Sequence, residues 1–534
     1  MIRISQMKLH IEHKEDEMLA KVAKLLHINK DEITSIDIVK KSLDARRDKG
    51  DISFVYTVDV YVKNEKKINK KVYSNNITKA VKEKYSFKPS GEEKLNNSPI
   101  IVGMGPCGMF AAYMLALNGY KPIVLERGKS VDERKTDVDK YWETGILDTT
   151  SNVQFGEGGA GTFSDGKLNT MVKDKSGRNK LVLEVFNKFG ADKEITYVNK
   201  PHIGTDVLME VVKNMRNEII RLGGDIRFSS HVTDILIQDN AVKGVVVNGK
   251  EHVYTDNVIL AIGHSARDTF DMLYEHNIMM EPKNFAVGVR IQHSQEMIDT
   301  EMYGYSHRKS NVLKASDYKL TGHATNGRSV FSFCMCPGGY VVNASSEEGR
   351  IAVNGMSYSD RNSENANSAI IVSVTKDDYP GEDALAGVRF QRQLEEAAYR
   401  EGKGKVPVQL LGDYCENKVS EGFGNVIPCI KGAYEFGNIN NIFKDEINEA
   451  LKECIVGFSK SISGFDRHDA ILAGVESRTS SPVRILRNND TLESVNIKGL
   501  YPAGEGAGYA GGIVSSAQDG IKVAEQIYKQ LKNK

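Results

Sequence analysis

Residues 99–128, PIIVGMGPCGMFAAYMLALNGYKPIVLERG, decide the fold of this chain. The short apolar run Ile100–Val102 is typical of a buried strand, and Met109–Leu117 is typical of a helix that follows it. Between them, Gly103-Met-Gly105-Pro-Cys-Gly108 fits the spacing G-x-G-x-x-G. This spacing predicts a tight strand-to-helix turn in which backbone N–H groups at the start of the helix bind a phosphate.

An acidic residue follows this turn at the distance that a dinucleotide-binding unit requires. Pro122–Leu125 is typical of the second strand of such a unit, and Glu126 comes at its end, about 18 residues after Gly108. A carboxylate at this place accepts hydrogen bonds from the ribose hydroxyls of an adenosine and disfavours a 2′-phosphate. The segment therefore predicts a Rossmann-type unit that suits FAD or NAD better than NADP.

A second glycine-rich segment lies near the other end of the chain. Gly499–Gly520, GLYPAGEGAGYAGGIVSSAQDG, predicts a short strand at Tyr501–Ala503 and a helix that begins at Gly511-Gly512-Ile513. The positive end of that helix would stabilise a reduced flavin, which is anionic at its N1–C2=O edge. Glu505 could accept hydrogen bonds from the ribityl hydroxyls. The two glycine-rich segments make sense only if they meet, and together they predict bound FAD.

Two further stretches have the G-x-G-x-x-G spacing, Gly156–Gly161 and Gly506–Gly511. Neither predicts a second dinucleotide site, because no convincing strand precedes the first and no strand follows the helix after the second. Gly161–Lys167 nearly fits a P-loop, but Leu168 stands where Ser or Thr would hold the metal. We expect the loop Phe155–Leu168 to wrap the pyrophosphate and ribityl chain of the cofactor with backbone N–H groups. A flexible surface loop is the alternative.

The expected cofactor contacts come from these segments and from the chain between them. No metal site is expected, since no set of ligands with metal-binding spacing is evident. The expected cofactor-binding residues are Gly103, Gly105, Pro106, Cys107, Gly108, Glu126, Arg127, Gly158, Gly159, Gly161, Thr162, Val232, Gly263, Gly504, Glu505, Gly511, Gly512 and Ile513.

The pattern of strands and helices divides the chain into three parts. Residues 1–97 predict a small α+β module, because apolar residues alternate along Ser53–Val62 and recur at helical spacing before it. Residues 98–267 and 471–534 predict a discontinuous Rossmann-type FAD-binding domain with both segments in one sheet. Residues 268–470 contain β-like runs between long polar loops, which indicates an inserted, mixed β-rich substrate domain. The expected fold class is α/β.

Composition bounds the functions open to this chain. At 534 residues it is long enough for several domains, and its Lys+Arg and Asp+Glu totals are both 71, so no overall field favours nucleic acid or a membrane. Residues 1–97 carry an excess of about six positive charges, which is either a solvated surface or a basic docking face. The 6 cysteines do not suggest a disulfide framework. The first residues lack the apolar run of a signal peptide, and we expect a cytoplasmic protein without a membrane span.

Candidates for the chemical step are fewer. The strand Val330–Phe333 leads into Cys334-Met-Cys336, whose thiols could exchange electrons or protons beside a flavin. The alternative is that these thiols are small apolar groups that only pack beside the flavin. The remaining candidates also have a structural alternative, either packing or salt bridges. These are His202 and His264 as proton donors, and Arg478 and Arg484 as a clamp for an anionic substrate.

These motifs resemble the FAD-binding elements of the glutathione-reductase-type flavoprotein superfamily. More narrowly, nearly the whole chain is similar to a bacterial group of FAD-dependent dehydrogenases of unknown substrate. The resemblance implies FAD, two C-terminal domains and an N-terminal accessory module. Glu505 departs from the wider superfamily, in which Asp is usual. The similar segments are Arg46-Arg47 with Phe54–Val58 (FVYTV), Phe155–Phe163 (FGEGGAGTF), Cys334–Gly339 (CMCPGG), Gly474–Pro482 (GVESRTSSP) and Gly504–Gly512 (GEGAGYAGG).

These features predict an FAD-dependent oxidoreductase in which a hydride passes through flavin N5 to or from an unidentified small-molecule substrate. Only one complete dinucleotide-binding unit is evident, so NAD(P)H is expected only as a transient electron donor that visits the flavin. Two other functions stay open. One is a flavoenzyme that acts on a macromolecule such as RNA through the basic N-terminal module. The other is a non-catalytic redox sensor that uses FAD and the two thiols.

Overall fold

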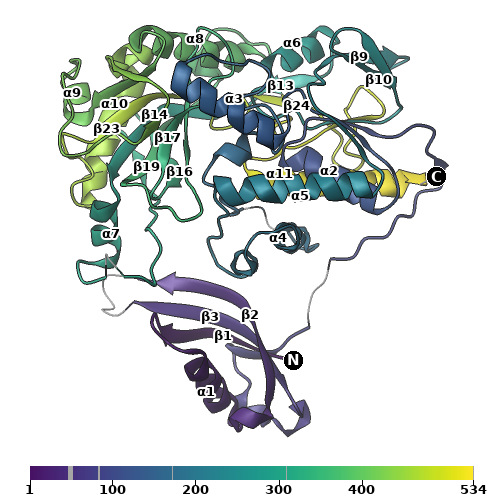
Figure 1. Cartoon of the computed structure of the whole chain (residues 1–534), viewed down its shortest axis with the longest axis vertical. Coiled ribbons are helices and arrows are strands. Elements are labelled where there is room, and N and C mark those ends of the chain that lie inside the picture. The colour runs from purple at the N-terminus through teal and green to yellow at the C-terminus, as the bar shows by residue number, and fades with distance from the viewer. Residues whose placement is uncertain (46–51, 82–84, 171, 173, 308–309, 533–534) are drawn as a thin grey trace.

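The computed structural model describes residues 1–534 except 46–51, 82–84, 171, 173, 308–309 and 533–534. Arg46 and Arg47, which belong to one motif of the resemblance, lie outside the described residues. Figure 1 shows a small N-terminal module beside a larger body, in which the C-terminal helix α11 lies alongside helix α2 from the first glycine-rich segment. Segments far apart in the sequence are therefore neighbours in the larger body.

A five-stranded parallel sheet forms one half of the larger body, in the order β25-β12-β6-β7-β8. Val258 lies opposite both Ile100 and Leu500, so the two glycine-rich segments flank the same central strand, as predicted. The central strands are apolar and buried, which is typical of a parallel sheet covered on both faces. The strands are β6 (Ile100–Val102), β7 (Ile123–Leu125), β8 (Asp225–Arg227), β12 (Val258–Leu260) and β25 (Leu500–Pro502).

Helices and a small antiparallel meander surround this sheet. Cys107–Ala116 of α2 is buried all round, because α2 packs between β6, α5 and α11. The helices are α2 (Pro106–Leu117), α3 (Val131–Thr144), α4 (Arg178–Lys188), α5 (Thr205–Arg221), α6 (Arg267–Glu275) and α11 (Ile513–Gln530). The meander consists of β9 (Val232–Gln238), β10 (Ala241–Val247) and β11 (Glu251–Tyr254), and β5 (Glu93–Lys94) pairs with β26 (Leu531–Lys532).

A seven-stranded sheet forms the other half, in the order β15-β16-β19-β14-β23-β20-β22. β23 pairs with β14 and β20, so residues 471–476 belong to this sheet and not to the parallel sheet, to which the sequence assigned them. An apolar run alone does not show which sheet a strand joins. The strands are β14 (Phe285–Ser294), β15 (Thr321–His323), β16 (Ser329–Cys336), β19 (Asn365–Val374), β20 (Val406–Leu410), β22 (Tyr434–Phe436) and β23 (Ile471–Glu476).

Smaller elements complete this half, and two short strands, β13 and β24, pair with each other in a sheet of their own. A three-stranded sheet has the order β18-β17-β21. Together with the parallel sheet, this arrangement confirms the α/β class with a Rossmann-type domain. The elements are β13 (Met280–Pro282), β24 (Val483–Ile485), β17 (Tyr340–Asn343), β18 (Val353–Met356), β21 (Ile430–Lys431), α7 (Gln295–Tyr303), α8 (Ala386–Glu401), α9 (Leu411–Cys415) and α10 (Asp445–Gly457).

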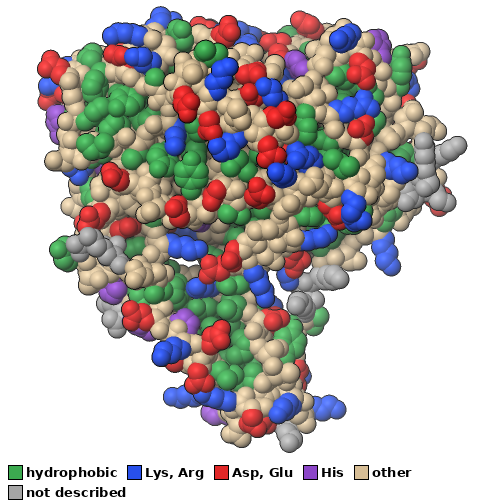
Figure 2. Space-filling view, in the orientation of Figure 1, with side chains coloured by type: hydrophobic (Ala, Val, Ile, Leu, Met, Phe, Trp, Pro, Cys, Tyr) green, Lys and Arg blue, Asp and Glu red, His purple; other side chains and the backbone are tan. Residues whose placement is uncertain are grey.

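The N-terminal module is a four-stranded sheet, β2-β3-β1-β4, with one helix packed against it. It meets the larger body at Lys41, whose N–H donates to the Tyr197 carbonyl at 2.8 Å. Figure 2 shows positive and negative side chains interspersed over its visible face. None of the described helices is both long and apolar enough to cross a membrane. The elements are β1 (Ile2–His10), α1 (Glu15–Leu26), β2 (Ile33–Asp44), β3 (Ser53–Val62) and β4 (Ile77–Lys79).

Candidate functional site

One cavity, with a volume of about 330 Å³, joins both glycine-rich segments. The carboxyl ends of β6, β7 and β12 open onto it, which is where open parallel sheets bind their ligands. Gly105 and Cys107 line it from the start of α2, and Gly512 and Ile513 line it from the start of α11. The prediction that the two segments meet at one site is thus confirmed.

The glycines at this cavity leave a cradle that side chains would fill. A Cβ atom placed on Gly263, Gly511 or Gly512 would meet no atom within 4 Å, so each faces open space. A Cβ atom on Gly105 would lie 3.7 Å from the Gly159 Cα atom. Gly105 and Gly512 are the N-cap residues of α2 and α11. The first N–H groups of a helix have no partner within it, so two positive helix ends face a space that fits a pyrophosphate.

Glu126 is fixed by the backbone at the end of β7. Its carboxylate, 5% exposed, accepts hydrogen bonds from the N–H groups of Met104 at 2.7 Å, Gly128 at 2.9 Å and Gly156 at 3.0 Å. A carboxylate has about four acceptor sites, so a further site stays open toward the cavity that Glu126 lines. This geometry fits the expected contact with ribose hydroxyls, which stays a prediction.

A flat surface lies beside Glu126. The Arg127 guanidinium is centred 4.3 Å from the Phe155 ring, and its Nη2 atom donates to Asp268 Oδ1 at 2.8 Å. Arg127 and Phe155 line the cavity together with Val232. Stacking surfaces and an apolar side chain of this kind fit a purine ring.

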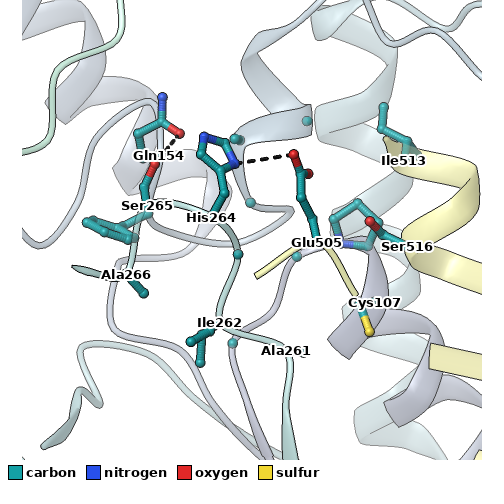
Figure 3. A pocket seen from close by; sticks show the side chains of 18 of the residues that line it. Cys107, Gln154, Ala261, Ile262, His264, Ser265, Ala266, Glu505, Ile513 and Ser516 are labelled. Carbon is teal, nitrogen blue, oxygen red and sulfur yellow. Dashed lines mark hydrogen bonds and ion pairs between the residues drawn. The ribbon is translucent and has the colours of Figure 1, made fainter. Parts of the chain in front are cut away.

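His264 reaches into the middle of the cavity (Figure 3). Its ring is buried, and Nδ1 lies 3.5 Å from Glu505 Oε1. Nε2 has no hydrogen-bond partner among the residues that the structure describes. The neighbouring Ser265 hydroxyl donates to Gln154 Oε1 at 3.0 Å, which holds this stretch in place. A bound molecule could therefore complete the hydrogen bonding of His264.

The cavity continues to a polar end formed by the seven-stranded sheet. Cys334 and Glu476 line this end. Arg290, fully buried, donates from Nε to Glu476 Oε2 at 2.8 Å and from Nη2 to Asn354 Oδ1 at 3.0 Å. Burial raises the pKa of Glu476, against the effect of Arg290. We call this region the thiol end; its lining residues are Lys167, Phe333, Cys334, Asn354 and Glu476.

Some expected cofactor residues support the cavity from behind. A Cβ atom on Gly108 would come 2.0 Å from the Gly103 carbonyl oxygen, and one on Gly504 would come 2.8 Å from the Cys107 Cβ atom. Thr162 Oγ1 donates to the Glu157 carbonyl at 3.3 Å. These residues, with Gly158, are positions of close packing and do not line the cavity. All the other expected cofactor residues do line it.

Three of the remaining candidates are placed differently from the expectation. His202 lines a separate cavity of about 760 Å³, and burial, followed by the charge of Arg361, lowers its pKa to about 4. Arg484 lies on β24 outside the first cavity, 3.8 Å from Glu281. Cys336 is buried behind Cys334 and does not line the cavity. None of these three side chains directly faces the space that the glycines form.

Arg478 lines the cavity, but its guanidinium is already engaged. Nε and Nη2 donate to Glu395 at 2.9 and 2.8 Å, and Nη1 donates to Ser346 Oγ at 2.6 Å. A clamp for an anionic substrate would need these same donors. The salt-bridge alternative therefore describes Arg478 in this structure.

Sequence reasoning missed Lys167 and Asp165 as site residues. Lys167 lines the thiol end of the cavity and Asp165 lines the wall next to it. Both come from the C-terminal end of the glycine-rich loop Phe155–Leu168. The near-match to a P-loop at Gly161–Lys167 was the available signal, since it placed a lysine directly after a loop expected to contact the cofactor. Asn354 and Gln154 carried no such signal.

Comparisons with known proteins match parts of the chain to a domain family and to distant relatives. Residues 284–479 match the family model described as "FAD-dependent protein, C-terminal domain-like", and residues 1–61 match a domain of unknown function. Among solved structures, a glycine oxidase from Bacillus cereus has a TM-score of 0.32 with 12% identity, over 82% of this chain and 96% of that chain. A thiamine thiazole synthase from Pyrococcus horikoshii is 28% identical over 176 residues, 32% of this chain and 54% of that protein.

One relative is similar along its whole length. An "Uncharacterized protein" of Clostridium beijerinckii is 49% identical over 534 residues, which is 99% of each chain. The chain therefore belongs to the same family as this clostridial protein, it carries an FAD-dependent protein C-terminal domain, and FAD is its cofactor.

Proposed function

We propose that the chain is an oxidoreductase that uses FAD to oxidise or reduce a small molecule bound at the thiol end of the cavity. The observation that carries this proposal is the continuity of one cavity, from Glu126 past both helix N-termini to Cys334 and Glu476. One part of it fits the cofactor, and the other part presents a thiol, an amine and a carboxyl group. Ligand sites are typically such concave spaces with a few convergent polar groups.

Residues at different places along this cavity would have different roles. Glu126 and the start of α2 would hold the adenosine and pyrophosphate, and the start of α11 would hold the flavin. When bound, FAD supplies two-electron chemistry by giving or taking a hydride at N5. His264 could hold or move a proton at Nε2, which has no hydrogen-bond partner among the described residues, and Glu476 could do so at its carboxyl group, whose pKa is raised by burial.

The electron donor is a separate part of this proposal. The part of the chain that the structure describes has one parallel sheet with a G-x-G-x-x-G turn. The other two stretches with this spacing contribute residues to the same cavity, Gly156, Gly159 and Gly161 from one and Gly511 from the other. NAD(P)H would then react by visiting the flavin, without a domain of its own. The motif Gly103–Gly108 with Glu126 supports placing the chain in the glutathione-reductase-type superfamily.

The test is an anaerobic screen of the FAD-loaded protein. NADH, NADPH and panels of small donors and acceptors are mixed with it, and the absorbance of oxidised flavin is followed. We expect at least one donor to bleach the flavin and one acceptor to restore it. Arg484→Ala should behave as the unmodified protein because Arg484 lies outside the cavity. If no compound changes the redox state faster than it does with free FAD, the proposal is wrong.

A further inference from the structure

The backbone at Cys334 has an unusual shape. β16 pairs with β19 through Phe333 and again through Cys336, and a bulge lies between the two positions. Cys334 has a φ of 43°, which is rare for a residue other than glycine. Bulges re-aim side chains next to active sites, and such conformations persist where the surroundings hold them in place. Here Arg290 Nη1 at 3.0 Å and the Cys336 thiol at 3.2 Å both donate to the Cys334 carbonyl.

Lys167 adds a second cation to the same end of the cavity, where it shares one carboxylate with Arg361. Its Nζ atom makes no hydrogen bond among the described residues, and its one ion pair there is with Asp165 at 3.5 Å. The Asp165 carboxylate is already bound by Arg361, through Nε at 3.1 Å and Nη2 at 2.5 Å, and it also accepts from the Ser357 hydroxyl. Asp165 is therefore shared by two cations, Arg361 and Lys167, and this group carries one net positive charge.

The other charges at this end are also paired. Arg290 and Glu476 form a buried pair at 2.8 Å, as described above. Two cations, Lys167 and Arg361, share one carboxylate and Arg290 is matched by Glu476, so one net positive charge remains at this end. A poorly hydrated ammonium is costly unless an anion lies near it. Cys334 lines the cavity with Lys167 and is the neighbouring group that can still become an anion.

We propose that Cys334 is a thiolate paired with the Lys167 ammonium, and that it is a nucleophile toward soft electrophilic carbon at the thiol end of the cavity. The inference rests on the proposed function only for the role of this cavity, because the charge state follows from the protein alone. This proposal differs from a redox pair of thiols, since the Cys336 thiol only donates a hydrogen bond to the Cys334 carbonyl.

The electrostatic surroundings agree with this assignment. Interaction with the neighbouring Cys336 side chain lowers the pKa of the Cys334 thiol, and the charges of Lys167 and Arg290 act in the same direction, against burial. The pKa of Cys336 is raised instead, so that this thiol keeps its proton. The titratable and charged groups around Cys334 come from several elements: Cys336 of β16, Arg290 of β14, Glu476 of β23, the loop residues Asp165, Lys167 and Arg361, and His202 and His264 farther out.

The reaction that reports this state is alkylation by iodoacetamide. The Cys334 sulfur attacks the methylene carbon, the S–C bond forms, and the C–I bond breaks as iodide leaves with its electron pair. No proton is released, because the attacking group is already a thiolate. The rate should therefore depend little on pH above the pKa of the thiol.

The experiment uses the full-length FAD-loaded protein and peptide mass spectrometry. Between about pH 6.5 and about pH 8.5 we expect the alkylation rate of Cys334 to change by less than about threefold, whereas that of the exposed Cys415 rises about a hundredfold. Lys167→Met should slow Cys334 at about pH 6.5 by about tenfold or more, and Lys167→Arg should keep the rate within about threefold. Each variant is first checked for FAD absorbance.

The outcomes separate this inference from the proposed function. If Cys334 is not alkylated at either pH, or if its rate rises as steeply as that of Cys415, the inference is overturned while FAD binding stands. Equal rates in the unmodified protein and in Lys167→Met would also overturn it. A protein that takes up no FAD would instead contradict the cofactor assignment and leave the charge state of Cys334 to be measured directly by the same alkylation profile.

Discussion

Gly105→Ala should weaken FAD binding without unfolding the protein. Gly105 has a φ of −72° and a ψ of −177°, which alanine adopts readily. The new methyl group would make ordinary contact at 3.7 Å with the Gly159 Cα atom, so the protein itself gives no reason for a clash. The methyl group would stand in the cradle at the start of α2, where the pyrophosphate is expected to approach the backbone.

The size of the effect follows from the hydrogen bonds at risk. If the methyl group displaces the phosphate from one backbone N–H group, about 1.5–3 kcal/mol of charge-assisted hydrogen bonding is lost. The dissociation constant of FAD should then rise by about 10- to 150-fold. Equilibrium titration of the apoprotein, followed by flavin fluorescence, measures this constant.

A matched control is Gly457→Ala. A Cβ atom on Gly457 would meet no atom within 4 Å, and this residue ends α10 and does not line the cavity. The free energy of unfolding of each variant apoprotein should equal that of the unmodified apoprotein to within about 0.5 kcal/mol, or be slightly higher. Unchanged FAD affinity in Gly105→Ala would refute the placement of the pyrophosphate at α2. Equal losses of affinity in both variants would refute it as well.

Three further predictions concern Glu126, Glu395 and His293. Glu126→Gln should weaken FAD binding by about tenfold or more, because both carboxylate oxygens accept backbone N–H groups and the NH2 group of glutamine cannot accept one. An unchanged dissociation constant would contradict this prediction. Glu395→Ala should lower the free energy of unfolding in urea by about 3–5 kcal/mol, because Arg267 and Arg478 then lose their buried partner; a loss below about 1 kcal/mol would contradict it. Burial lowers the pKa of His293 to about 4. The unfolded chain therefore binds more protons between about pH 6.5 and about pH 4, and the free energy of unfolding should fall as pH falls through this window. His293→Gln should reduce that fall by about 1–3 kcal/mol, and an unchanged slope would show that another group causes it.

Local signals predicted that the two glycine-rich segments meet at one cavity. A strand, a turn and a helix are encoded within about 30 residues at each glycine-rich segment, and parallel pairing then brings their carboxyl ends together. Glu126 could be placed because its distance from the turn is set by a single helix. The strand limits of the N-terminal module were also close, since Ser53–Val62 was expected and β3 spans the same residues.

The thiol end was harder to predict because it depends on contacts between distant segments. Asp165 meets Arg361, which lies 196 positions farther along the chain. Nothing near Lys167 in the sequence shows that it shares the Asp165 carboxylate with Arg361. The sequence left Arg478 open between a substrate clamp and a salt bridge for the same reason, since its partner Glu395 is 83 positions away. The sequence also did not show that β23 joins the seven-stranded sheet, because this depends on pairing with the distant strands β14 and β20.

The buried charges between the two halves connect stability to the geometry of the site. Arg267 belongs to α6 beside the parallel sheet, and its guanidinium meets Glu395 of α8 in the other half at 2.7 Å. Glu395 also holds Arg478, whose Nη1 donates to Ser265 Oγ at 3.2 Å.

Such buried pairs add little net stability compared with apolar packing, but removing one partner is costly, so they favour one relative placement of the two halves. Because Ser265 follows His264 directly, that placement also orients the unpartnered Nε2 atom in the cavity. We therefore expect Glu395→Gln to alter the pH profile of any turnover that His264 supports. Glu395 itself lies outside the cavity and touches neither cofactor nor substrate in this account.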